Sequence, residues 1–244
     1  MFLISCILKQ ENIWIKKCDF MYKFILKRIL DIILSSIAII ILCPILVPVA
    51  AGLLLTGEHY IFYLQERIGY KNLKFNIYKF ATMLKDSPNI GTGLHTTLKD
   101  PRILQMGGFL RKTKINELPQ LFNIFLGSMS IVGPRPLVDK TFEPYSDYVK
   151  KNIYNVKPGL SGIGSIIFRD EEKLLSNSKI PIDEFYSQYI SPYKGELELW
   201  YQKKISFRTD FIIIFLTLWV VLFPTSNLVF KVFSDLPSKP DFLK

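Results

Sequence analysis

The sequence predicts a membrane-associated α+β protein, in which an apolar N-terminal helix precedes a mostly helical domain with a few short strands. The first observation is an uncharged run of 24 residues, 32–55, of which fifteen are Leu, Ile or Val. The second is that two later segments alternate apolar and polar residues with a period of two, and the third is that longer segments repeat apolar residues every three or four positions. We divide the chain into an extension (1–21), a membrane-inserted helix (22–57), a polar domain (58–210) and a C-terminal apolar segment with a tail (211–244).

The composition excludes several classes of protein. With 244 residues, 49% of them hydrophobic and 14% aromatic, the chain can build a packed core and is not disordered. Its net charge of +10 suits a nucleic acid, an anionic membrane surface or a phosphorylated ligand. The three cysteines lack CxxC spacing and there are only two histidines, which argues against a disulfide framework and a histidine-rich metal centre.

The first twenty residues are expected to be a dispensable extension. Met21 opens a second plausible start, and residues 1–8 lack the basic region and the long apolar run of a signal peptide. N-terminal sequencing of the native protein tests this expectation, which fails if residues 1–20 are found.

The uncharged run is long enough to enter a membrane. As a straight helix, residues 32–55 would extend about 36 Å, against about 30 Å for a hydrocarbon core. Pro44 and Pro48 lie near its middle, where each removes a helical hydrogen bond. Basic residues flank both ends, so the positive-inside rule places both flanks in the cytoplasm. We therefore expect a re-entrant helix that dips in and returns; a kinked transmembrane helix and a soluble core helix are the alternatives.

Two short strands are expected after this helix. In the segment IFYLQERIGY, Phe62, Leu64 and Ile68 fall on one face, and in KFNIYKF the residues Phe75 and Ile77 do the same.

A helix with one buried face is expected over residues 115–126, where apolar residues recur at steps of three and four. Pro119 is tolerated only in a first turn, so we place the helix start at Asn116, as the N-cap. Glu117 would then lie at the positive end of the helix dipole, where it could hold a phosphate–metal pair. The alternative is a plain capped helix.

A rigid loop is expected at residues 133–136, Gly-Pro-Arg-Pro. The two prolines keep Gly133 and Arg135 out of helical conformations. Arg135 is thereby a restrained, fork-shaped donor that suits phosphate oxygens, unless it is an incidental arginine in a surface turn.

Taken in order, the motifs QERIGY, FNIYKFATM, GGFLRKTKINELPQL, SMSIVGPRP and VKPGLSG resemble the bacterial sugar transferase family. The resemblance covers Tyr22 to Asp210. Members are monotopic polyprenyl-phosphate phosphoglycosyl transferases, also called undecaprenyl-phosphate sugar phosphotransferases. It implies transfer of a sugar-1-phosphate from a UDP-sugar to undecaprenyl phosphate with Mg²⁺, releasing UMP. It also implies a catalytic domain on the cytoplasmic face of the bacterial inner membrane, at the first membrane step of exopolysaccharide, lipopolysaccharide or glycoconjugate synthesis.

The resemblance also implies roles for individual residues. Glu117, Asn116, Lys79 and Arg135 are the expected catalytic residues, with Glu117 as the Mg²⁺ ligand. The expected substrate-binding residues are Arg67, Arg111, Gly133, Pro134, Pro136 and Lys157. For the basic members of this second set, a solvated surface charge is the alternative.

The sequence departs from the family pattern at three charged positions. The family has an Asp-Glu pair whose Asp is the nucleophile, whereas this chain has Asn116 before Glu117, and an amide is a poor nucleophile. Ala81 replaces a usual arginine and Ser128 a usual aspartate. Three interpretations follow: Glu117 is itself the nucleophile; the lipid phosphate attacks the donor directly while Glu117 holds Mg²⁺; or the protein is catalytically impaired and acts as a membrane-bound assembly partner.

The C-terminal part adds a second apolar segment. Residues 211–223 are thirteen uncharged residues, too few to span, so we expect them to lie in or against the membrane, with Trp200 and Trp219 as headgroup anchors. The tail after Pro224 is expected to be poorly structured. Anionic lipids are the expected partners of the basic flanks, and nucleic acid is not, because no nucleic-acid motif is present. The sequence names neither the sugar nor the oligomeric state, for which a dimer is one option.

Overall fold

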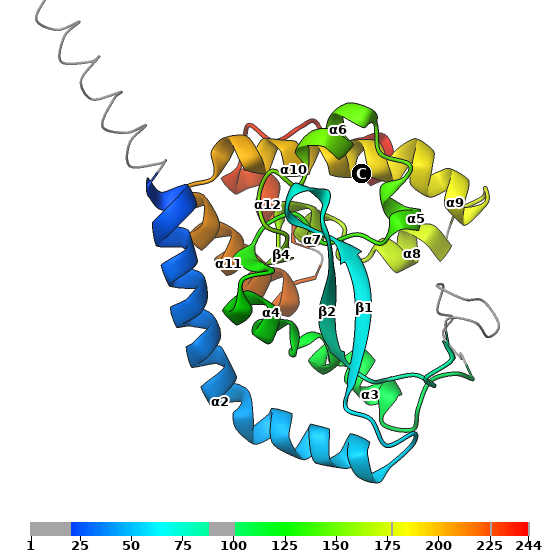
Figure 1. Ribbon diagram of the computed structural model, residues 1–244. Coiled ribbons are helices and arrows are strands. Elements are labelled where there is room, and N and C mark those ends of the chain that lie inside the picture. Colours follow the sequence, from blue (N-terminus) through cyan, green and yellow to red (C-terminus); the bar gives the residue numbers. More distant parts are fainter. Residues whose placement is uncertain (1–20, 88–100, 177, 225, 244) are drawn as a thin grey trace, which may run out of the picture.

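The computed structural model describes residues 21–87, 101–176, 178–224 and 226–243. The expected extension, apart from Met21, lies outside these residues. One long helix, α2 (Lys27–Leu55), runs along a body of shorter helices that contains two small sheets (Figure 1). The predicted mixture of many helices and few short strands is confirmed.

Helix α2 is continuous over 29 residues and follows a π-helical turn, η1 (Tyr22–Leu26). Pro44 and Pro48 lie inside it, and the helix bends along its length (Figure 1). The segment is one continuous, bent helix without a hairpin turn. Whether this bent helix re-enters the membrane or spans it stays a prediction. It is long and apolar enough to cross a membrane, and only 6% of its most apolar 18-residue window is buried in the protein. A soluble core helix would be mostly buried, so that alternative does not describe α2.

The two expected strands are present as β1 (Phe62–Ile68) and β2 (Lys74–Phe80), and they pair antiparallel with Tyr63 opposite Lys79. The short helix η2 (Tyr70–Asn72) joins them. The alternation of β1 is present, but its apolar face points outward: Phe62 and Leu64 are 40% and 51% exposed. The opposite, half-buried face of β1 carries Arg67.

The helix expected to start at Asn116 begins later. Helix α3 (Gly107–Lys112) is followed by a 3₁₀ turn, η4 (Ile115–Glu117), and α4 (Gln120–Leu126) starts only after Pro119. The left-handed φ of 60° at Lys114 redirects the chain, and Pro119 has no N–H to continue the turn. Asn116 therefore caps no helix, and the expected position of Glu117 in a first α-helical turn is wrong.

A second, parallel sheet joins β3 (Ser130–Val132) to β4 (Gly159–Ser161). Helices α5 (Asp139–Phe142) and α6 (Asp147–Asn152) lie between the two strands in the chain. An added Cβ at Gly159 would lie 2.1 Å from the Gly133 nitrogen, so the close approach beside these strands requires glycine.

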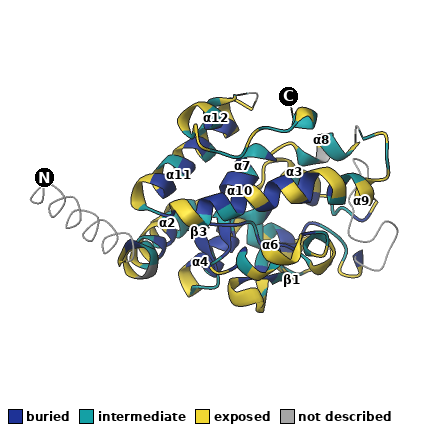
Figure 2. Ribbon diagram, turned by 90° about the horizontal axis from the view of Figure 1, so that it is seen from above, coloured by how far each residue is buried: buried dark blue, intermediate teal, exposed yellow. Residues whose placement is uncertain are grey.

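The C-terminal half supplies most of the core. Buried residues gather around α10 (Ser191–Lys204) and α7 (Ile163–Ile167) (Figure 2). The central side chains Leu197, Tyr201 and Ile213 are fully buried. The remaining elements are α8 (Glu171–Ser176), α9 (Ile182–Phe185), η5 (Tyr186–Ile190), α11 (Phe207–Leu222), α12 (Leu228–Val232) and η6 (Asp241–Leu243).

The expected boundary at residue 210 falls within α11, whose buried side chains, such as Leu216, join the main core. The expectation of a poorly structured tail is wrong for the described residues after 225: Val229 is 3% exposed, and Phe233 packs edge-to-face on Trp200 at 5.0 Å between ring centroids. The outer face of α11 carries exposed large apolar side chains, namely Phe207, Phe211, Phe215, Leu218 and Leu222.

Candidate active site

Three of the predicted catalytic side chains meet at one place. Lys79 comes from β2, Glu117 from η4, and Arg135 from the loop after β3. Oε1 of Glu117 lies 3.4 Å from Nη2 of Arg135 and 3.8 Å from Nζ of Lys79. The structure thus brings together an acid and two cations that are far apart in the sequence.

The charges in this cluster act strongly on one another. Burial alone raises the pKa of Glu117, but the positive charges of Arg135, Lys79 and Lys114 outweigh it and hold the pKa at about 2. Burial lowers the pKa of Lys79 to about 8; Glu117 opposes this shift, and the charges of Arg67, Arg135 and Arg111 add to it. Glu117 is therefore ionised at neutral pH, and Lys79 loses its proton closer to neutrality than an ordinary lysine.

The loop that carries Arg135 is fixed through its main chain. The Gly133 N–H donates to the Ser161 carbonyl at 2.9 Å, and the Gly159 N–H donates to the Pro134 carbonyl at 2.8 Å. The Tyr154 hydroxyl donates to the Arg135 carbonyl at 2.8 Å. The expectation of a stiff loop around Arg135 is supported by these bonds as well as by its prolines, and the bonds place Gly133 and Pro134 in the scaffold of the site.

Arg67 supports the same loop from β1. Its Nη1 donates to the Pro136 carbonyl at 3.2 Å and its Nη2 to Oε1 of Gln65 at 2.6 Å, while its buried Nε has no hydrogen-bond partner among the described residues. Burial and the neighbouring Arg135 lower the pKa of Arg67 to about 10. Arg67 is thus not a solvated surface charge.

The other two predicted cations separate. Arg111, on α3, lies close enough to lower the pKa of Lys79. Lys157 lies beside Arg28 instead: an added Cβ at Gly127 would be 3.5 Å from Nζ of Lys157 and 3.0 Å from Nη2 of Arg28. The substrate-binding role expected for Lys157 stays a prediction, and its position gives it no contact with Glu117.

Comparison with known proteins gives the family. The bacterial sugar transferase family matches residues 22–224. The chain belongs to this family. A sugar transferase of Haemophilus influenzae without an assigned reaction is 35% identical over 212 residues, 81% of this chain and 41% of that protein. The UDP-glucose:undecaprenyl-phosphate glucose-1-phosphate transferase of Escherichia coli is 33% identical over 190 residues, 77% of this chain and 40% of that protein.

The region shared with the family is longer than the motifs indicated. It runs past residue 210 to residue 224, so it includes both α2 and α11. An exopolysaccharide production protein of Sinorhizobium fredii is 34% identical over 176 residues, 66% of this chain and 76% of that protein. By contrast, this sugar transferase chain spans about two fifths of the length of the Haemophilus influenzae and Escherichia coli relatives.

The three departures from the family pattern do not form one altered site. Asn116 is 8% exposed, and its Oδ1 has no hydrogen-bond partner in the described part of the chain. Ala81 is fully buried. Ser128 exchanges hydrogen bonds with Asn123, which itself holds β2 by accepting from the Tyr78 N–H at 2.8 Å. Asn116 directly precedes Glu117 in the charged cluster, whereas Ser128 is engaged with Asn123.

The cluster has a surplus of positive charge. Five cations act on Glu117 or on one another here, namely Lys79, Arg67, Arg111, Lys114 and Arg135, and with the one carboxylate they leave a net charge of +4 when all are ionised. Such a surplus matches a diphosphate. In the described residues, no group of three or more His, Cys, Asp or Glu could hold a metal ion alone. One carboxylate and one unpaired amide oxygen nevertheless fit Mg²⁺, which takes its other ligands from water and substrate phosphates.

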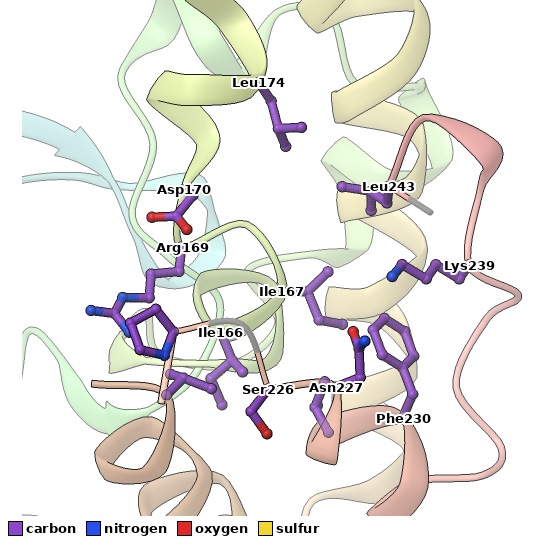
Figure 3. Close-up of a pocket in the computed structure, with 13 residues that line it drawn as sticks. Ile166, Ile167, Arg169, Asp170, Leu174, Ser226, Asn227, Phe230, Lys239 and Leu243 are labelled. Carbon is purple, nitrogen blue, oxygen red and sulfur yellow. The ribbon is translucent and has the colours of Figure 1, made fainter. Parts of the chain in front are cut away.

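A cavity of about 220 Å³ lies elsewhere in this chain (Figure 3). Arg169 and Asp170 line it from the chain after α7, and Phe230 and Lys239 from the C-terminal segment. It contains none of the site residues predicted from the sequence, and it plays no part in the proposal below.

Proposed function

We propose that the chain transfers a sugar-1-phosphate from a UDP-sugar to undecaprenyl phosphate and releases UMP. The observation that carries the proposal is that the ionised Glu117 lies among a surplus of cations, beside a rigid loop that holds Arg135 next to it. The relatives support it: the Escherichia coli protein is named for this reaction with UDP-glucose, and a Salmonella typhimurium relative for transfer of galactose phosphate to undecaprenyl phosphate.

The donor diphosphate would be bound by Arg135, Lys79 and Arg111. Arg135 offers two donors in a plane and has a restrained backbone, so little entropy is lost when it binds. Arg67 contributes mainly by holding the Pro136 carbonyl, because both of its Nη atoms already donate to the protein. Glu117 lies near both Lys79 and Arg135, where its negative charge reduces their mutual repulsion, and its carboxylate would also contact a bound metal cation.

Mg²⁺ would be held by Glu117, by Oδ1 of Asn116 and by the donor phosphates. When bound, it would neutralise charge that develops on the phosphates. In this proposal, Asn116 offers an uncharged ligand oxygen at the position where the family has its nucleophilic aspartate.

Two routes would deliver the product. In the first, a Glu117 oxygen attacks the β-phosphorus, the bond from this phosphorus to the UMP oxygen breaks, and undecaprenyl phosphate then displaces Glu117. In the second, an oxygen of undecaprenyl phosphate attacks the β-phosphorus directly, the bond from this phosphorus to the UMP oxygen breaks, and UMP leaves. The two cations beside Glu117 favour the second, because a carboxylate stabilised by two cations is a weak nucleophile. Intact-protein mass spectrometry without acceptor separates them, since only the first adds a phosphosugar to the protein.

The same proposal places the protein on the cytoplasmic face of the bacterial inner membrane, at the first membrane step of surface polysaccharide synthesis. Helix α2 and the outer face of α11 carry exposed apolar side chains, including Ile40 and Ile41 on α2 at 72% and 68%. Basic residues of η1 and α2, Lys23 and Arg28 among them, would contact anionic lipids.

The deciding experiment is UMP release from detergent-solubilised protein with Mg²⁺, undecaprenyl phosphate and a panel of UDP-sugars. We expect UMP only when the lipid acceptor is present, and none from Glu117→Gln. Asn116→Asp is assayed in parallel, because it restores the usual acid pair. No UMP from the native chain on any donor, with activity in Asn116→Asp, would overturn the proposal and indicate a catalytically impaired assembly partner.

A further inference from the structure

Glu198 is a buried carboxyl group that the mechanism above does not use. It lies on α10, is 2% exposed, and neither of its oxygens completes a hydrogen bond of good geometry with the described residues. An unsatisfied buried carboxyl is unfavourable and calls for an explanation. Its lysine neighbour on the same helix, Lys194, pairs with Oε2 of Glu171 at 2.7 Å instead.

The surroundings of Glu198 lead to the Arg135 loop. Its carboxyl group faces the main-chain N–H groups of Arg135 and Gly164. The Arg135 N–H has no other backbone acceptor in the described chain. An added Cβ at Gly164 would lie 2.3 Å from Oε1 of Glu198, so the carboxyl group fits only because this residue is glycine.

Tyr154 holds the other side of the same peptide units. Its hydroxyl donates to the Arg135 carbonyl at 2.8 Å and accepts from the Leu137 N–H at 3.0 Å. The Arg135 peptide unit therefore has the hydrogen-bonded Tyr154 hydroxyl at its carbonyl and the buried Glu198 carboxyl facing its N–H. Its outer side carries the guanidinium group, 3.4 Å from Glu117.

We propose that Glu198 is a positioning residue, which orients the guanidinium of Arg135 toward the donor phosphates by holding the Arg135 main-chain N–H. The inference rests on the proposed transferase function. Burial raises the pKa of Glu198 to about 8, so its carboxyl is mostly protonated at neutral pH. A glutamine side chain has the length of glutamate and carries one acceptor and one donor, so it reproduces the protonated carboxyl. Aspartate keeps the carboxyl group but is one methylene too short.

The test compares Glu198→Gln with Glu198→Asp, and each with the same change in an Arg135→Ala background. We expect Glu198→Gln to keep kcat/KM within about threefold and Glu198→Asp to lose about ten- to a hundredfold, chiefly through a higher KM for the UDP-sugar. In the Arg135→Ala background, Glu198→Asp should change kcat/KM by less than about threefold, because the group on which it acts is gone. Glu196→Gln is the matched control, since it changes an exposed carboxylate on the same helix, α10.

Amide hydrogen exchange supplies a readout that does not need turnover. Glu198→Asp should speed exchange in the peptide that covers residues 133–137, and leave the α12 peptide and the melting temperature unchanged. Equal losses in both backgrounds, an Asp variant as active as the Gln variant, or unchanged exchange in the loop would each overturn the proposal. Absence of turnover in the native chain would refute the transferase function alone, and the exchange result would still decide the role of Glu198.

Discussion

Two charged clusters in this protein are built on opposite principles. Around Asp210, the Tyr22 hydroxyl donates to Oδ2 at 2.7 Å, the Tyr201 hydroxyl donates to Oδ1 at 2.7 Å, and Lys27 forms an ion pair with Oδ2. This cluster, which we call the clamp, ties η1 and α2 to α10 and α11. Around Glu117, the two nearest cations are Arg135 and Lys79, whose nitrogens lie 3.4 and 3.8 Å from its Oε1. Among the described residues, Arg67 and Arg111 form no ion pair with this carboxylate.

The difference supports the proposal that the clamp stabilises the fold and that the Glu117 cluster binds a ligand. Every charged or hydroxyl group of the clamp already has a partner, so it can accept nothing more. The Glu117 cluster keeps donors in reserve and a surplus of positive charge, which is unfavourable until an anion binds. We therefore expect the two clusters to have different uses: the complete pairing of the clamp stabilises the fold, and the incomplete pairing around Glu117 suits the binding of an anion.

The largest expected effect comes from breaking the clamp. Lys27→Met removes one partner from a buried ion pair, which should reduce the free energy of unfolding by about 3–5 kcal/mol and the melting temperature by roughly 6–20 °C. Thermal unfolding in detergent measures this. The double variant with Asp210→Asn should regain part of the loss, because no unpaired charge remains. A single variant as stable as the native chain would remove the basis of the comparison.

Arg135→Lys should affect activity without affecting stability. Lysine keeps the charge but loses the planar pair of donors, so we expect kcat/KM for the UDP-sugar to fall roughly ten- to a hundredfold. The melting temperature should stay within about 2 °C, because the Arg135 side chain is 40% exposed and the loop is held through its main chain. A large fall in melting temperature would mean that the Glu117 cluster serves the fold as the clamp does.

The pH dependence should report Lys79. Because its pKa is about 8, Lys79 loses its charge as the pH rises through 8, and kcat/KM should fall toward tenfold per pH unit above that value. Glu117, with a pKa of about 2, stays ionised and contributes no limb between pH 5 and 8. Lys79→Arg should shift the alkaline limb upward or remove it. An unchanged limb in this variant would assign it to another group.

The smallest effect is expected at an exposed pair of ion contacts. Lys74 lies 2.9 Å from both Glu66 and Asp139, closer than either cation lies to Glu117, but all three side chains are at least half exposed. Solvent screens such contacts, so Lys74→Ala should leave both melting temperature and activity unchanged within error. A measurable loss would show that distance alone, without burial, ranks these clusters.

Local patterns in the sequence predicted much of the fold. The length and composition of α2, both strands of the first sheet and the stiffness of residues 133–136 follow from hydrophobic runs, alternation and proline geometry. The sequence did not predict that Phe62 and Leu64 face outward, because alternation separates the two faces of a strand without saying which face is covered. The sequence also did not predict the late start of α4, because Lys114 adopts a left-handed conformation that its residue type does not favour.

The sequence by itself determined the membership of this chain in its family, the residue types of the site and the amide in place of a usual acid, since these depend only on residue order. Tertiary structure alone decided which charges act together. It set Lys157 beside Arg28, bonded Ser128 to Asn123, packed the tail on Trp200 and placed Glu198 under Arg135. The reason is that the burial of a charged side chain and its ion pairs depend on contacts between distant segments. Those contacts set the pKa values of the site and decide which hydrogen-bond donors are available to a ligand.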